Sequence, residues 1–407
     1  MAAACAGPDV ADGSGEAQAI AGGRVAADAA YVRQAAAELL AAPDPAGHCA
    51  LAPRALRFDA TFRTDIDWLN AFSMLWLGWA NLDVRRPDGA GEAAYYREWG
   101  FKLVSTFTDK PVFNLDNKLV GGIKYTLLER DGVYFLTFRH SNNINDWLAD
   151  FALNYKAKPE ASFALGASDV HTGFYDYLDT VWVRRDGKGI LDALGRVDPA
   201  RSKPVVVAGH SLGGSLANLA SAGLAREGWA VRGVYLTGSS RIAGPRWNAA
   251  AAALTMRGPS GPYTLEDVTF RVTSGYDPVA RVPTHEDAAP ALERLGKQFL
   301  PNAVRDNERL ASLAADFAQS TLWLADNLIP GASGSFGAMG ATYEFDEGGV
   351  LKRSSLLADK NDAAYWTAVG DHVAAGATAP ERVGRFAKTL GYHFVRNPDG
   401  YGCVMLR

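Results

Sequence analysis

The residues best suited to chemistry stand where an apolar segment runs into a glycine-rich turn. Residues 205–214 read VVVAGHSLGG, and an Ala- and Leu-rich stretch continues to Arg226. Gly209 and Gly213 suit a tight turn around Ser211, because a side chain at either position would crowd the neighbouring backbone. A serine hydroxyl at such a strand-to-helix corner is placed to attack a carbonyl carbon. The pattern predicts a nucleophilic serine. The competing interpretation is a glycine-rich turn with an incidental serine.

We call this strand-to-helix turn around Ser211 the elbow. The neighbours of Ser211 in it are His210 and Leu212. A helix that begins directly after the serine points its first backbone N–H groups toward negative charge that develops nearby. The N–H of Leu212 is therefore the first candidate donor to the oxyanion of an acyl-transfer reaction.

A serine nucleophile needs a base, and the base needs an orienting carboxylate. In a mostly parallel sheet the carboxylate should follow a later strand, at its carboxyl end. Asp277 follows the apolar run VTFRVTS in this way, whereas Asp267 precedes that run and Asp287 lies further along the loop. We expect Asp277 to be the acid. The alternative is an Asp-Pro turn that only caps the loop.

The base must be one of seven histidines. In the chain order serine, acid, base, the histidine should follow the acid. His285 follows Asp277 too closely. Two candidates are left, His372 and His393. We favour His393 because it stands after a predicted helix in a terminal loop, where such bases lie. His372 stays open as the alternative base.

The segments around these residues predict the elements that must position them. Apolar runs at 205–208, 233–237 and 268–274 alternate with helical patterns at 212–226 and 247–254. This rhythm indicates an α/β protein with a mostly parallel central sheet and helices on both of its faces. Upstream strands are expected at 102–107, 124–129 and 133–139, with Asp131-Gly132 as the hairpin turn.

Helical patterns precede and interrupt this sheet. The aromatic-rich run 65–82 predicts a buried helix, and residues 285–330 predict a helical insertion. Residues 341–345 predict a last strand, followed by a helical tail. We expect residues 1–30 to be disordered, because they are rich in Ala and Gly, and residues 31–407 to form a single domain.

Composition excludes several functional classes. The chain of 407 residues has a net charge of -4, which argues against nucleic acid as a partner. No apolar run is long enough to span a membrane, and the N-terminus lacks the pattern of a signal peptide. Three cysteines without a CxxC pair do not form a disulfide scaffold or a metal site. We expect a soluble protein, with a secreted or periplasmic location left open, that needs no metal or cofactor. Oligomeric state is not determined by these patterns.

Several spaced motifs resemble the class 3 lipases, the family that includes fungal triacylglycerol lipases. Residues 138–141 (FRHS) and 146–151 (DWLADF) are similar to the family's FRG[ST] block and its continuation. Residues 170–174 (VHTGF), the elbow GHSLGG, 235–244 (YLTGSSRIAG) and 271–283 (RVTSGYDPVARVP) are similar to further family motifs, in the same order. The aromatic helix is similar to that of bacterial members.

The resemblance implies an α/β-hydrolase fold and hydrolysis of lipid acyl esters. It assigns the nucleophile to Ser211 and the acid to Asp277, and it implies that Ser141 contributes a second oxyanion contact. It also implies a lipid or ester substrate and transient contact with a membrane or lipid interface. A lid is implied for about residues 148–168, where the apolar side chains could equally be core.

The sequence departs from the family pattern in ways that leave alternatives open. His140 replaces the glycine of the FRG[ST] block, and neither His372 nor His393 is followed three or four residues later by the family's tyrosine. The insertion 285–330 is also longer than the family's usual connection. A triacylglycerol lipase or carboxylesterase is the leading hypothesis. The alternatives are an effector with phospholipase A1 activity and an inactive hydrolase-fold binding module.

Overall fold

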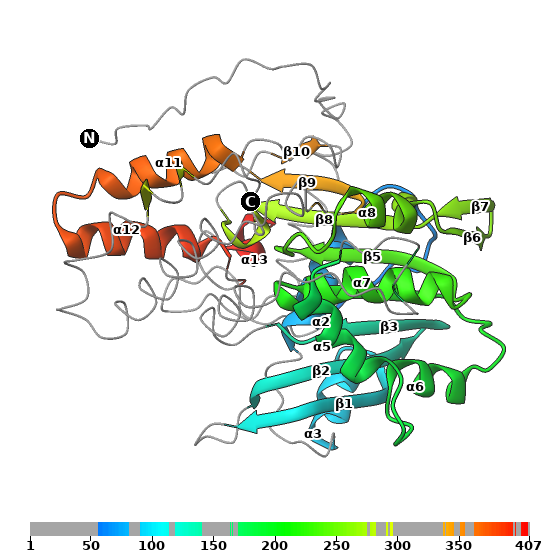
Figure 1. The fold of residues 1–407 in the computed structure, drawn as a ribbon. Coiled ribbons are helices and arrows are strands. Elements are labelled where there is room, and N and C mark those ends of the chain that lie inside the picture. The colour runs from blue at the N-terminus through cyan, green and yellow to red at the C-terminus, as the bar shows by residue number, and fades with distance from the viewer. Residues whose placement is uncertain are drawn as a thin grey trace.

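The computed structural model describes a subset of the chain that contains the sheet, its flanking helices and the elbow (Figure 1). The described residues are 56–80, 90–113, 119–140, 163, 165, 170–274, 277–281, 290–291, 294–295, 337, 339–345, 351–354, 362–393, 395 and 400–405. The expected disordered segment 1–30 and nearly all of the insertion 285–330 lie outside these residues.

An eight-stranded sheet runs through the molecule in the order β1-β2-β3-β4-β5-β8-β9-β10. Its strands are β1 (Lys102–Phe113), β2 (Leu119–Arg130), β3 (Val133–Phe138), β4 (Val205–His210), β5 (Val231–Thr237), β8 (Thr269–Ser274), β9 (Ala341–Phe345) and β10 (Leu351–Ser354). Strands β3, β4, β5, β8 and β9 pair in parallel, and the outer pairs β1-β2, β2-β3 and β9-β10 are antiparallel. The predicted mostly parallel sheet is confirmed.

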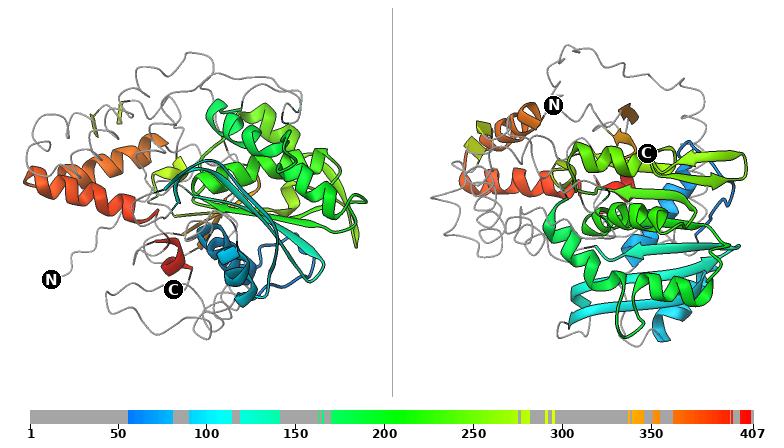
Figure 2. Two further views of the ribbon diagram at one scale, coloured as in Figure 1. Left: turned by 90° about the horizontal axis from the view of Figure 1, so that it is seen from below. Right: turned by 45° about the vertical axis from the view of Figure 1, so that its right-hand side comes forward.

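Helices cover both faces of this sheet (Figure 2). One face carries α5 (Thr172–Trp182), α6 (Ile190–Val197), α7 (Leu212–Arg226) and α8 (Pro245–Ala252), and the other carries α2 (Trp68–Ala80) and α3 (Ala90–Glu98). Successive strand residues point to opposite faces. Val207 accordingly packs with the first group of helices, whereas Val206 packs with α2. Both neighbours are apolar because the strand is buried on both sides.

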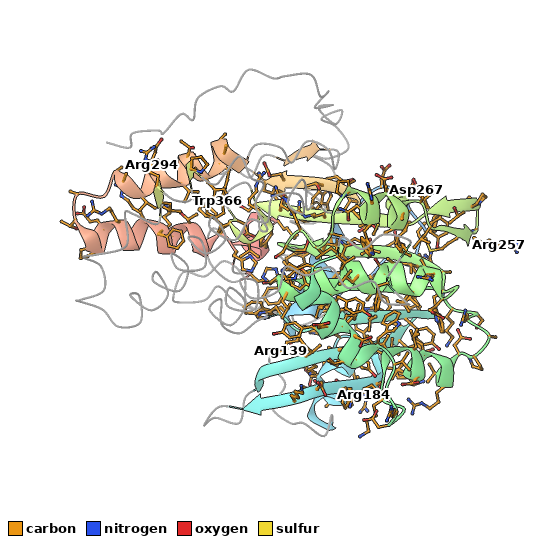
Figure 3. The ribbon with its side chains drawn as sticks, viewed as in Figure 1. Arg139, Arg184, Arg257, Asp267, Arg294 and Trp366 are labelled. Atoms are coloured by element: carbon orange, nitrogen blue, oxygen red, sulfur yellow. The ribbon has the colours of Figure 1, made fainter. Side chains whose placement is uncertain are left out.

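The remaining elements lie at the two ends of the sheet (Figure 1). A small hairpin of β6 (Thr255–Gly258) and β7 (Gly261–Thr264), followed by the short 3₁₀ turn η1 (Glu266–Val268), lies at the amino end of β8, whereas η2 (Val279–Arg281) follows the carboxyl end of β8. At the end opposite the hairpin, α11 (Asp362–Ala374) and α12 (Ala379–Gly391) lie side by side, near α13 (Tyr401–Val404). Figure 3 shows Arg257 and Asp267 at the hairpin end, Arg294 beside the paired helices, and Trp366 on α11.

The aromatic run near residue 70 forms the predicted buried helix. In α2, Phe72 and Trp76 are fully buried four residues apart, on the face that packs against the sheet. Gly78 allows the closest approach, because a Cβ there would lie 3.3 Å from the Cα of Gly209 and from the backbone nitrogen of His210. Helix α2 thereby contacts the elbow directly.

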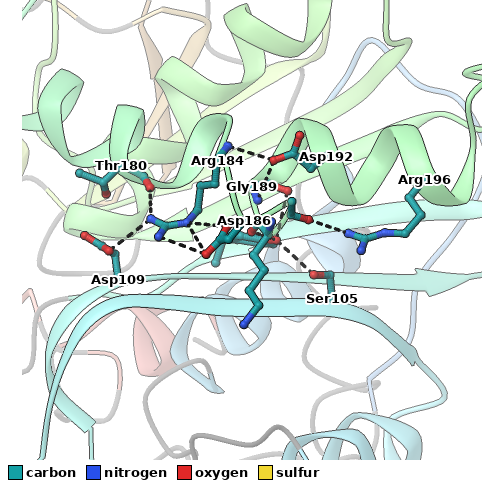
Figure 4. A network of polar contacts seen from close by, with 11 residues as sticks. Ser105, Asp109, Thr180, Arg184, Asp186, Gly189, Asp192 and Arg196 are labelled. Atoms are coloured by element: carbon teal, nitrogen blue, oxygen red, sulfur yellow. Dashed lines mark hydrogen bonds and ion pairs between the residues drawn. The ribbon is translucent and has the colours of Figure 1, made fainter.

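A polar network fixes the segment between α5 and α6 to the edge of the sheet (Figure 4). The Arg184 guanidinium lies 3.2 Å from a carboxylate oxygen of Asp109 on β1 and donates to the carbonyl of Thr180 at 2.7 Å. It also lies over the ring of Phe107, 4.2 Å from the centroid. The backbone N–H of Arg184 donates to Asp192, which caps the start of α6. These contacts join the edge strand to the helices of one face.

Candidate active site

Ser211 occupies a strained corner between β4 and α7. Its backbone angles are φ 58° and ψ -129°, a region that non-glycine residues rarely adopt. The Ser211 N–H donates to the carbonyl of Thr237 on β5 at 3.0 Å. A Cβ on Gly213 would lie 2.5 Å from the carbonyl oxygen of Phe138, and one on Gly209 would collide with the backbone of Gly213. The two elbow glycines therefore let α7 begin directly against β3 and β4.

His393 lies within hydrogen-bond distance of the Ser211 hydroxyl. Its Nε2 is 2.8 Å from Ser211 Oγ, and its Nδ1 is 2.9 Å from Oδ2 of Asp277. A carboxylate only accepts, so Nδ1 carries the hydrogen and Nε2 accepts from the serine hydroxyl. The imidazole follows α12 and is only 4% exposed. The structure thus brings Ser211, His393 and Asp277 into one line of hydrogen bonds, whereas His372 lies exposed in the last turn of α11.

Asp277 follows β8 and is fully buried. Its Oδ1 accepts the backbone N–H of Val279 at 2.8 Å, and its Oδ2 accepts from His393 and from the hydroxyl of Tyr401 at 2.6 Å. Asp277 is therefore oriented by donors on both oxygens.

Tyr401 is a residue that sequence reasoning missed. It comes from α13, it is fully buried, and its hydroxyl oxygen accepts the N–H of Ser274 at 3.0 Å. Burial, and the neighbouring Asp277 carboxylate, raise the pKa of Tyr401 well above its usual range, so the phenol stays a donor. Gly238 leaves room for this ring, since a Cβ there would lie 2.8 Å from it. The available signal was a tyrosine after the base, but it stands eight residues after His393 rather than three or four.

Two buried arginines support the loop that carries Asp277. Arg271 donates to the carbonyls of Ala280, at 2.6 Å, and Ser239, and Arg241 donates to the carbonyl of Arg281 at 3.1 Å. Both guanidinium groups are buried below the surface. Their bonds to carbonyl oxygens fix the path of the chain after Asp277, because each donor is directional.

His210 lies against the imidazole of His393. The two rings are stacked with centroids 4.9 Å apart, and Nδ1 of His210 is 3.1 Å from the carbonyl oxygen of Thr237. Burial, together with the nearby His393 and His140, lowers the pKa of His210 well below its usual range. The residue before the serine is therefore a neutral ring that packs on the candidate base.

The expected oxyanion residues are only partly described. Leu212 opens α7, so its N–H lies among the first N–H groups of that helix. Ser141 lies outside the described residues, but the preceding His140 is buried and stacks on Trp79 with centroids 4.3 Å apart. Arg139, at the end of β3, marks the same end of the sheet in Figure 3.

Little of the expected lid is described. Trp147, Phe151 and Leu153 lie outside the described residues. Phe163 is 1% exposed and packs on Trp182, 4.9 Å away between ring centroids. At this position the core-packing interpretation holds.

The described residues also bear on metals and membranes. Among them, no group of three or more His, Cys, Asp and Glu side chains is arranged to hold a metal ion. Within the same part of the chain, no helix has the length and apolar character required to cross a bilayer.

Comparisons with known proteins agree with the resemblance seen in the sequence. A profile of the family described as Lipase (class 3) matches residues 135–286. The "Secreted mono- and diacylglycerol lipase 1" of Fusarium solani is 30% identical over 148 residues, which are 36% of this chain and 38% of that protein. The chain thus matches well under half of the length of this curated relative.

Solved structures give similar matches. The native lipase–propeptide complex of Rhizomucor miehei is 18% identical, with 65% of this chain and 66% of that one covered and a TM-score of 0.36. The lipase of Rhizopus microsporus var. chinensis is 22% identical, with 45% and 56% covered and a TM-score of 0.33. Residues 135–286 thus match the class 3 lipase family, which the ordered motifs of the sequence also resemble.

Proposed function

We propose that this chain is a serine ester hydrolase that cleaves lipid acyl esters. One observation carries the proposal: Ser211, His393 and Asp277 form a continuous hydrogen-bonded line at the carboxyl ends of parallel strands. Ser211 also stands on a nucleophile elbow inside the segment that matches the class 3 lipases. Nucleophile, base and orienting acid are the parts that acyl transfer through a serine requires.

Acylation begins when Nε2 of His393 takes the proton of the Ser211 hydroxyl as Oγ attacks the ester carbonyl. Asp277 stabilises the resulting imidazolium through Nδ1–H without taking the proton itself. Collapse of the tetrahedral intermediate breaks the ester C–O bond, and His393 gives its proton to the departing alcohol. Water then attacks the acyl-enzyme with His393 again as base, which releases the fatty acid and restores Ser211.

The negative oxygen of each intermediate needs at least two donors. The N–H of Leu212, at the start of α7, is one, because the helix N-terminus favours negative charge there. The family resemblance assigns a second contact to Ser141. Removal of one such donor typically costs about 100- to 1,000-fold in kcat.

The proposed substrates are acylglycerols presented at a lipid surface. The Fusarium relative is named a secreted mono- and diacylglycerol lipase, and we extend that substrate class and a secreted or periplasmic location to this chain. Transient contact with a lipid interface is part of this proposal.

Hydrolysis of p-nitrophenyl esters from acetate to palmitate tests the reaction. Ser211→Ala and His393→Ala should each lower kcat by about 10⁴-fold or more, whereas His372→Ala, which changes an exposed histidine, should not. A serine-directed phosphonate should label the wild type and not Ser211→Ala. A wild type that is inert on every ester and is not labelled would favour the binding-module hypothesis.

Substrate class needs a separate assay. Diacylglycerol, triacylglycerol and phosphatidylcholine emulsions, compared at equal interfacial area, distinguish a lipase from a phospholipase. A rise in rate when the substrate exceeds its solubility indicates action at the interface, and saturation below that limit indicates an esterase.

A further inference from the structure

A column of aromatic rings connects α2 to the candidate base. Trp79 stacks on His140, with centroids 4.3 Å apart and ring planes within 16°. His140 meets His210 edge to face at 5.7 Å, and His210 stacks on His393 at 4.9 Å. Each ring in turn limits the movement of the next.

The four rings come from four different elements. Trp79 stands near the end of α2, His140 directly follows β3, His210 ends β4, and His393 follows α12. The column therefore joins segments whose relative positions decide where the base lies. Contacts between distant segments constrain geometry more than contacts within one element do.

Independent anchors hold the column at several points. The close approach of Gly78 to the elbow backbone sets the position of the adjacent Trp79. His140 is 5% exposed and His210 is 1% exposed, and the Thr237 carbonyl holds the second of these rings. Trp79 is half-buried, so the column runs from the partly exposed end of α2 to the buried ring of His393.

The charge on the base makes this packing relevant to the reaction. When His393 becomes an imidazolium, a neutral His210 at its face avoids the repulsion that two like charges would cause. The groups that face this column are Asp277 and Tyr401, which bond to or flank His393, and the hydroxyl of Ser211. Displacement of His210 would change the contact that its ring makes with His393 and with the edge of Tyr401.

We propose that Trp79 and His140 are positioning residues for His393 and act through His210. The inference rests on the proposed function, because it gives these side chains a role only if His393 is the base. It also gives a role to the departure from the family pattern, since His140 replaces a glycine that has no ring to stack.

Steady-state hydrolysis of a soluble short-chain p-nitrophenyl ester tests the proposal. The variants are Trp79→Ala, His140→Ala, their combination, and the ring-preserving Trp79→Phe and His140→Phe. We expect each alanine variant to lower kcat about tenfold or more with KM nearly unchanged, because small misplacement of a catalytic group is costly. The double variant should lose no more than the worse single variant, and each phenylalanine variant should recover most of kcat.

Trp229→Ala is the matched control. Trp229 is a buried tryptophan that contacts Tyr134, next to the amino ends of β4 and β5. Its loss should lower the melting temperature and leave kcat of the folded protein unchanged. All variants are compared at a temperature where circular dichroism shows them folded.

The outcomes separate this inference from the proposed function. If the wild type hydrolyses esters, Ser211→Ala does not, and both alanine variants keep wild-type kcat, the positioning role is wrong. A low kcat in His140→Phe together with a shifted acidic limb of its pH profile would also overturn it, since the proton of His140 would then be what matters. If Ser211→Ala equals the wild type, the proposed function itself fails.

Discussion

At the scale of single residues, Ser211, the proposed nucleophile, is held in an unfavourable backbone conformation. A non-glycine residue held in such a region costs about 1–3 kcal/mol, and here the surrounding elements impose it. Glycine adopts this conformation freely but loses about 0.5–1 kcal/mol through its larger entropy in the unfolded chain. The strain should therefore be measurable as the difference in unfolding free energy between two variants that lack the hydroxyl.

Ser211→Gly should be more stable than Ser211→Ala by about 1 kcal/mol, although both lack the hydroxyl of the proposed nucleophile. Urea unfolding followed by tryptophan fluorescence gives the two free energies of unfolding. Equal stability of the two variants would mean that the corner stores no strain.

Tyr401→Phe removes the hydroxyl that donates to Asp277 and accepts from Ser274. A hydrogen bond to a charged group contributes about 1.5–3 kcal/mol. Without it, the Asp277 carboxylate should be held less firmly in the orientation that bonds His393. We expect kcat to fall about tenfold with KM retained.

The control for this variant is Tyr263→Phe. The Tyr263 hydroxyl donates to the carbonyl of Val231 at 2.8 Å, at the start of β5 and away from the elbow. That variant should lose stability but keep kcat. A Tyr401→Phe protein with wild-type kinetics would show that the backbone donor at Val279 and the His393 contact suffice to orient Asp277.

His210 should make stability depend on pH. Burial keeps its pKa well below the usual value, so in weak acid the unfolded chain binds a proton there that the folded chain does not. Above about pH 6.5, His210 does not lower the free energy of unfolding. As the pH falls below that value, the free energy of unfolding decreases by at most about 1.4 kcal/mol per pH unit. Wild type should lose more stability between about pH 7 and pH 5 than His210→Gln does. Parallel curves for the two proteins in chemical denaturation would contradict this.

The sequence predicts some residues of the candidate site better than others. Ser211 and Asp277 directly follow apolar strands, so the rule that sites lie at carboxyl ends selected both. His393 was favoured only by its place after a helix, and nothing in the pattern near Tyr401 connected it with Asp277. The contact between Tyr401 and Asp277 spans 124 positions, and the one relevant pattern, a tyrosine three or four residues after the base, does not fit a tyrosine eight residues after His393.

At the scale of elements, long periodic or fully apolar segments were predicted well. Helix α7 begins and ends where its pattern predicted, and the hairpin at Asp131 and Gly132 turns with both residues at positive φ. The short hairpin β6–β7 and strand β10 were missed, because each of these three strands has only four residues. Strand β1 continues to Phe113, beyond the predicted end at residue 107. The prediction ended early because Asp109, Lys110 and Pro111 are residue types that are uncommon in strands.

A buried ion pair connects α3 to β2 at the end of the sheet nearest the elbow. Lys124 pairs with Glu92, and the two side chains are 3% and 1% exposed. Burial, and the nearby positive Arg139, lower the pKa of Lys124 to about 7. Loss of one partner would leave the other uncompensated in a dry environment.

Lys124→Met should therefore destabilise the fold by about 3–5 kcal/mol, because Glu92 is left as a buried, unpaired carboxylate. The double variant Glu92→Leu/Lys124→Met should recover most of that loss, since apolar side chains of similar size suit a buried position. Guanidinium unfolding of the two variants and the wild type measures the difference. A double variant as unstable as the single one would show that packing, rather than charge, dominates there.

At the scale of the whole molecule, the candidate site is assembled from segments that are far apart in the chain. Both faces of the sheet contribute: α7 begins at Ser211 on one face, while Tyr401 and Val395 pack in the cluster with α2 on the other. The alternation of strands and helices predicted this layered architecture. It did not predict how the C-terminal segment returns to the sheet, because that path depends on tertiary contacts rather than on local pattern.

The order of these segments has a consequence for the synthesis of the protein. Ser211 is followed by Asp277, then by His393, 182 positions after the serine, and then by Tyr401. At about 5–20 residues per second, a ribosome needs roughly 10–40 s to pass from the serine to the histidine. During that interval β4 and α7 exist without His393, the proposed base. If the proposed function is right, the growing chain cannot attack lipid until the segment that carries His393 has emerged and docked, so the order of translation delays activity near the ribosome.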